Sequence, residues 1–220
     1  MRAKLVAFAG RERRDQRKAA QTFEVALRSA TGPERAAAQY GSAVVALALE
    51  QPAQAASWLA QARETLARTP GAQPDHPFLA SLDTRIVLAR EGAEAALATL
   101  TSAAKTFPDE PELHQLHAEL LLRLGRNEQA LAYLEDLMAL TRSDTDLWRL
   151  LADARAALGQ TGLAHWATAE RYALLGGWAA AVQQLNLAVR DSGLTYYELS
   201  QIDARRQHFE SELLREREER

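Results

Sequence analysis

The chain has 220 residues, of which 47% are hydrophobic and only 6% aromatic, and its formal net charge is −3. A slightly acidic chain lacks the basic footprint on which phosphate binding depends, so we expect no nucleic-acid partner. The sequence contains no cysteine, which excludes disulfides, thiolate zinc sites and cysteine nucleophiles. No stretch is apolar for long enough to cross a bilayer, so we expect no direct membrane insertion.

The composition favours an all-α fold. Alanine, the best helix former, dominates the apolar residues, and the alternating Val/Ile/Thr-rich runs typical of strands are absent. The few glycines and prolines, 11 and 7 residues, cluster between segments of helical periodicity. The sequence therefore predicts helices joined by short turns.

Small residues recur at a fixed interval in the middle of the chain. Ala130 lies 34 residues after Ala96 and 34 before Ala164, and Gly125 and Gly159 are also 34 apart. A period of 34 residues, with small residues at turns and helix crossings, is typical of tetratricopeptide repeats. We therefore predict a tetratricopeptide-repeat α-solenoid, a right-handed superhelix of antiparallel helix pairs with a C-terminal capping helix.

In chain order, the predicted elements make up one tetratricopeptide-like domain over residues 1–220. A spacing of 17 residues, half a repeat, separates Gly159 from Gly176 and Ala164 from Ala181, so residues 161–175 can serve two neighbouring units. The predicted segments are entry helices at 1–31, a repeat with an insertion at 32–76, repeats at 77–110 and 111–144, a repeat and half-repeat at 145–192, and the capping helix at 193–220.

His114 and His117 stand three residues apart and raise the question of a metal site. A zinc site needs three or four ligands, and this pair supplies two. Glu119 is expected on a different helix face, and the remaining histidines are single in the sequence. The sequence also lacks H-E-x-x-H, G-x-S-x-G and phosphate-binding glycine loops. We therefore expect both histidines inside a repeat, no cofactor, and no enzyme activity in this chain.

The remaining candidate for function is the concave groove that first helices line in such arrays. Its surface mixes both charges with apolar residues, and it lacks the Lys/Asn/Arg set that clamps a C-terminal carboxylate. We expect it to bind protein partners or peptide segments, although a solvated surface without a partner remains an alternative. The groove positions hold Arg85 and Leu88 in one first helix, Gln115, Glu119, Leu122 and Arg123 in the next, and Arg149 and Asp153 in the third.

The C-terminal half resembles a known family. Residues 147–190, followed by "YYELSQIDARRQHFE", are similar to the tetratricopeptide array of bacterial periplasmic zinc metalloproteases of the β-barrel assembly-enhancing type. The half-repeat step contributes to the likeness, and "RAKLVAF" at 2–8 looks like the exit from a protease domain. Two motifs of this chain carry the resemblance. The first is E-x-Y-x-L-x-G, at Glu170, Tyr172, Leu174 and Gly176, and the second is I-D-A-R, at Ile202 to Arg205.

The resemblance implies a noncatalytic module that docks substrate or outer-membrane assembly partners and positions the protease site. The chain would then be a fragment located in the periplasm, with its own protease domain as a further partner. Zinc would belong to that domain alone, because its H-E-x-x-H ligands are absent here and no catalytic residue carries over. The alternative is a stand-alone scaffold or adaptor, expected in the cytoplasm, that binds peptides in its groove.

Overall fold

A computed structural model describes residues 13–219, which contain eleven α-helices and no strand. The predicted exit at 2–8 and the beginning of the entry helices lie outside these residues. The described residues form two compact units, one ending at His114 and the next beginning at Gln115. The all-α prediction is confirmed, whereas the assignment of residues 1–220 to one domain stays a prediction. Among residues 13–219, no helix has the length and apolar character required to cross a membrane.

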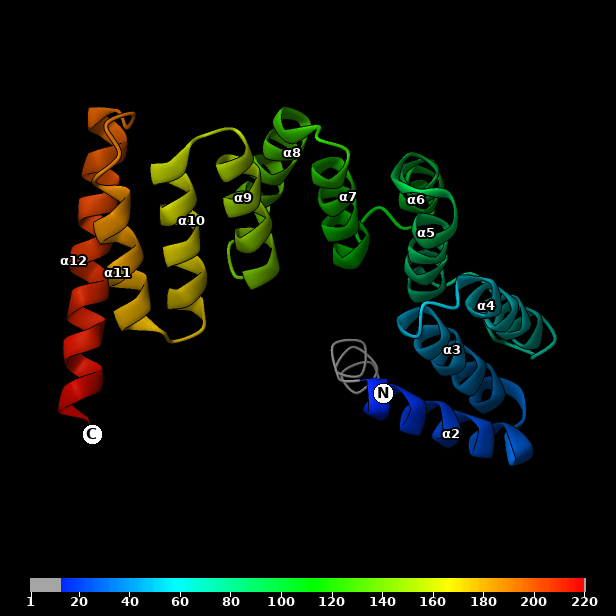
Figure 1. Cartoon of the computed structure of the whole chain (residues 1–220). Coiled ribbons are helices and arrows are strands. Elements are labelled where there is room, and N and C mark those ends of the chain that lie inside the picture. The colour runs from blue at the N-terminus through cyan, green and yellow to red at the C-terminus, as the bar shows by residue number, and fades with distance from the viewer. Residues whose placement is uncertain (1–12, 220) are drawn as a thin grey trace. The chain divides into compact units, whose positions relative to one another are not determined.

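The first unit is a succession of helices, each packed on the next, with α2 on α3, α3 on α4, α4 on α5 and α5 on α6 (Figure 1). Prolines stand in the first turns of α3, α4 and α5, where the missing N–H costs no helical hydrogen bond and the fixed φ suits the helix. The helices are α2 (Arg13–Ser29), α3 (Gly32–Ala48), α4 (Pro52–Ala67), α5 (Pro77–Glu91) and α6 (Ala93–Thr106).

Small side chains bring the helices of this unit together. Ala43 and Ala55 are completely buried where α3 and α4 meet, and Leu59 and Ile86 extend the same core to α5. An ion pair of 2.9 Å between Arg63 and an aspartate of α5, Asp83, joins α4 to α5 at the margin of this core. Residues 68–76 connect α4 to α5, and their assignment as an insertion in the repeat stays a prediction.

The second unit continues from α7 with further helices, and Figure 1 shows α9, α10, α11 and α12 following one another in chain order. The boundary with the first unit falls within α7. The helices are α7 (Pro111–Arg123), α8 (Asn127–Leu140), α9 (Thr145–Ala157), α10 (Thr161–Leu174), α11 (Trp178–Ala188) and α12 (Tyr196–Glu218).

The residues that revealed the repeat occupy the positions that a helix pair requires. Ala118 and Ala130 are completely buried, one on α7 and one on α8. Gly125 and Gly159 follow the ends of α7 and α9 with φ of +70° and +74°, a left-handed conformation that glycine adopts without the steric cost of a Cβ. The 34-residue period therefore marks both helix contact and helix ending.

Helix α10 packs against helices on both of its sides. Ala167 belongs to the core that α10 shares with α9, while Ala169 and Ala173 belong to the core formed with α11 and α12. This two-sided packing agrees with the half-repeat spacing, in which residues 161–175 complete one unit and begin the next.

Helix α12 covers the last core of the chain. It begins with a capping box, in which Thr195 accepts from the Glu198 N–H and the Glu198 carboxylate accepts from the Thr195 N–H. Ile202 and Phe209, one and three turns further on, are buried against α10 and α11. An apolar face directed at the array and a charged outer face suit the role of a cap.

Asp191 fastens the turn between α11 and α12 to the start of α10. Its Oδ1 accepts from the Gly193 N–H at 2.9 Å and its Oδ2 from the Gly162 N–H at 2.5 Å. These two hydrogen bonds hold the pKa of the Asp191 carboxyl below its usual value of 3.8, because they favour the charged form.

We expect Asp191→Ala to lower the melting temperature at neutral pH, and the difference from the wild type to shrink in acid. Because the native pKa is depressed, the carboxylate stabilises the fold above about pH 4, and this contribution is lost as the pH falls through the native pKa. Thermal unfolding followed by circular dichroism at about pH 7 and about pH 3 measures the difference. A difference that stays constant across this range would contradict the assignment.

Candidate partner-binding face

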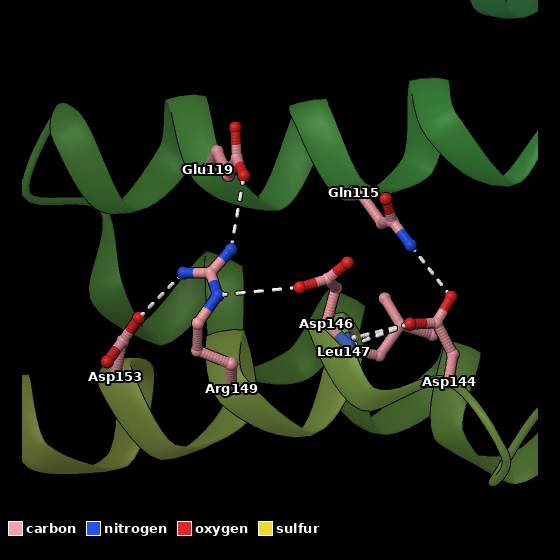
Figure 2. Close-up of polar contacts among 7 residues, drawn as sticks. All are labelled: Gln115, Glu119, Asp144, Asp146, Leu147, Arg149 and Asp153. Carbon is pink, nitrogen blue, oxygen red and sulfur yellow. Dashed lines mark hydrogen bonds and ion pairs between the residues drawn. The ribbon is translucent and has the colours of Figure 1, made fainter. Parts of the chain in front are cut away.

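Helix α9 is positioned against α7 by its own N-cap. The Asp144 Oδ1 accepts from the backbone N–H groups of Asp146 and Leu147 at 2.8 and 3.2 Å, which satisfies two donors at the start of the helix. Its Oδ2 accepts from Gln115 Nε2 on α7 at 2.7 Å. Figure 2 shows this contact spanning the two helices. One carboxylate therefore both caps α9 and links it to α7.

One turn further along α9, Arg149 is surrounded by carboxylates (Figure 2). Its Nη2 lies 3.2 Å from Glu119 Oε1 on α7, its Nη1 lies 3.2 Å from Asp153 Oδ2, and its Nε lies 3.8 Å from Asp146 Oδ1. The contact with Glu119 crosses between helices, whereas the other two lie along α9. The Arg149–Glu119 ion pair and the Gln115–Asp144 hydrogen bond link α7 to α9. We use the name α7/α9 face for the polar surface formed by Gln115, Glu119, Asp144, Asp146, Arg149 and Asp153.

The α7/α9 face is accessible to solvent. The side chains of Glu119 and Arg149 are 36% and 38% exposed, and those of Asp146 and Asp153 are 58% and 56% exposed. Ion pairs with this exposure contribute little to stability, in general under about 1 kcal/mol each. Their main effect is to fix the orientations of side chains that a partner can reach.

The structure brings together four of the predicted groove residues: Gln115, Glu119, Arg149 and Asp153. Arg123 is exposed in the last turn of α7. Leu122 is half-buried and packs against the core of α7, α8 and α9, so its side chain is a core residue as much as a surface residue.

Arg85 lies half-buried on α5 in the first unit, and Leu88 is half-buried on the same helix. Sequence reasoning missed Asp144 and Asp146, which complete the α7/α9 face. A helix-start signal could have indicated Asp144, because an aspartate directly before an apolar-periodic segment is a preferred N-cap.

His114 and His117 participate in packing. The His117 ring stacks on Tyr133 of α8 with 4.6 Å between centroids, and burial raises the pKa of the Tyr133 hydroxyl. His114 Nε2 lies 2.7 Å from the Pro108 carbonyl oxygen. Within the part of the chain that the structure describes, no group of three or more histidines, aspartates or glutamates is arranged to hold a metal ion.

Comparison with known proteins gives the class of this fold. Residues 88–160, which include all of α7, α8 and α9, match the family model for the tetratricopeptide repeat. No curated protein sequence matches the chain. Together with the helix pairs and their buried alanines, the match confirms the predicted fold class, an all-α tetratricopeptide-repeat solenoid.

Domains of this fold class share a general function. Tetratricopeptide repeats are protein–protein interaction modules, and they bind protein or peptide partners through surfaces that the stacked helices present. Such domains are typically noncatalytic, in keeping with the expectation that this chain is not an enzyme. The α7/α9 face lies inside the matched residues, on the first helices of two successive pairs.

Proposed function

We propose that the chain is an interaction module that binds a protein partner through the α7/α9 face. The observation that supports this proposal most directly is the arrangement around Arg149, where side chains from two successive first helices hold one another in place. Side chains that are oriented before binding lose less conformational entropy when a partner docks. The face also lies within the residues that match the tetratricopeptide repeat.

A quantitative pull-down tests this proposal. The bait is the full chain beside Arg123→Ala/Asp153→Ala, which changes Asp153 of the α7/α9 face and the exposed Arg123 one turn beyond Glu119 on α7. We expect the wild type to enrich one or more proteins and the variant to lose most of that enrichment, measured by mass spectrometry of the bound material.

The matched control is Glu128→Ala/Asp136→Ala, which changes two exposed residues of α8 and should bind as the wild type does. Equal recovery by all three baits would place binding elsewhere on the chain and refute the role of the α7/α9 face.

A more specific proposal is that this module belongs to a periplasmic zinc metalloprotease and docks substrate or outer-membrane assembly partners. It is supported by the resemblance, whose two motifs contribute the partners of one ion pair, Glu170 and Arg205. In this proposal zinc resides only in the protease domain, and that domain is a further partner. A stand-alone scaffold or adaptor, located in the cytoplasm, is the competing proposal.

The same pull-down, carried out in envelope extract, distinguishes these two proposals. Recovery of outer-membrane assembly proteins, together with an in-frame H-E-x-x-H domain upstream in the genomic sequence, would support the protease module. Partners confined to the soluble fraction, with no such reading frame, would refute it in favour of the adaptor.

A further inference from the structure

We propose that the partner segment at the α7/α9 face is basic, presenting lysine or arginine side chains to the carboxylates of α9; this inference rests on the proposed function. The sequence places Arg149 and Asp153 together in a groove of mixed charge and does not indicate the charge of the partner. The contacts of Arg149 favour a basic one.

All three nitrogens of the Arg149 guanidinium already face carboxylates of the chain. Nη2 faces Glu119, Nη1 faces Asp153 and Nε faces Asp146, at 3.2, 3.2 and 3.8 Å. A partner carboxylate would have to displace one of these groups to form the two-pronged contact that arginine makes best. It would also add a further negative charge to a site that holds three, and like charges at this distance repel.

The same arrangement leaves negative charge in excess on the surface. The side chains of Asp146 and Asp153 are each more than half exposed, whereas the Arg149 side chain between them is 38% exposed. Asp144 adds a fourth carboxylate at the start of α9, and the contacts drawn in Figure 2 include one arginine, Arg149, beside these four groups.

A cationic side chain that approaches α9 therefore finds two aspartates that are more exposed than the arginine between them. Lysine and arginine satisfy this surface, because each adds the opposite charge and donates hydrogen bonds to carboxylate oxygens. Charge complementarity at an exposed face acts mainly on specificity and on the rate of encounter, and it weakens with salt.

Three labelled synthetic peptides of equal length provide the test. They carry lysine, glutamate or glutamine at the same positions of one neutral background, and fluorescence anisotropy measures their binding to the full chain at low ionic strength. We expect the lysine peptide to bind most tightly, and Asp146→Asn/Asp153→Asn to weaken it by about tenfold. Added salt should remove most of the difference between wild type and variant.

The matched control is Glu128→Gln/Asp136→Asn, which neutralises two exposed carboxylates of α8 and should leave the lysine peptide bound within about twofold of the wild type. An equal loss of affinity in both double variants would mean that only the net charge of the chain matters, and it would overturn the inference.

The remaining outcomes separate this inference from the proposed function. Preference for the glutamate peptide, lost in Arg123→Ala/Asp153→Ala, would refute the basic partner and retain the face as the binding surface. Failure of all three peptides to bind would overturn the inference, and the pull-down would then decide whether the proposed function falls with it.

Discussion

Phe209→Ala is expected to lower the free energy of unfolding by about 3 to 5 kcal/mol, the largest effect of a single truncation that we expect in this chain. The Phe209 side chain is 1% exposed in the core formed by α10, α11 and α12. Its ring lies 5.7 Å from that of Trp178 and beneath the guanidinium of Arg205, 4.6 Å from the ring centroid. Truncation would leave a cavity, and the neighbouring groups would lose the van der Waals contacts that they make with the ring.

Chemical denaturation followed by tryptophan fluorescence measures this loss, and Tyr197→Ala is the control. Tyr197 is an aromatic residue of the same helix but is 70% exposed, so its truncation should cost no more than about 0.5 kcal/mol. A loss below about 1 kcal/mol for Phe209→Ala would mean that α12 does not cap the array as described.

Arg205→Ala is expected to cost about 2 kcal/mol of stability, because it leaves the Glu170 carboxylate buried without its charged partner. Arg205 Nε and Nη2 donate to the two oxygens of Glu170 at 2.6 and 2.5 Å, and Trp166 Nε1 donates to the same carboxylate at 3.0 Å. The Glu170 side chain is 10% exposed and that of Arg205 is 39% exposed. The exposure of the arginine keeps the expected cost below that of a fully buried pair.

Arg215→Ala provides the matched comparison on the same helix. Its exposed ion pair with Glu212 should contribute less than about 0.5 kcal/mol. A double variant, Glu170→Leu/Arg205→Leu, should recover part of the loss, since it removes both charges at once. If Arg205→Ala cost no more than Arg215→Ala in the same denaturation experiment, the pair would not anchor α12.

The repeat architecture could be predicted because its evidence is periodic and local. A helix crossing tolerates only a small side chain, so Ala96 and Ala130 recur at the repeat length and both are completely buried. A helix that must end and reverse favours glycine with positive φ, so Gly125 and Gly159 recur at the same length. Such steric requirements act at single positions and can therefore be read from the chain without coordinates.

The polar contacts could not be predicted in the same way. Helical spacing placed Gln115, Glu119, Arg149 and Asp153 on the faces of two first helices, but it could not indicate that Arg149 joins three carboxylates. Which charges meet depends on the distance between helices and on side-chain rotamers, neither of which leaves a periodic signal.

The ion pair between Glu170 and Arg205 illustrates the same limit over a longer range. The two residues are 35 apart in the sequence, and each belongs to one of the two motifs that carry the family resemblance. The structure supplies a physical reason for both motifs, since one contributes a buried carboxylate on α10 and the other the guanidinium on α12 that neutralises it.

Site-directed photo-crosslinking tests the central claim, that the α7/α9 face binds a protein partner, most directly. A benzophenone amino acid replaces Ala156, about one turn beyond Asp153 on α9, in one variant and Asp136 of α8 in another, both exposed positions outside the residues assigned to binding. After irradiation in an extract that contains the partner, we expect a crosslinked product from position 156 and none from position 136. Crosslinks from position 136 alone would contradict this claim and move the binding surface to the second helices.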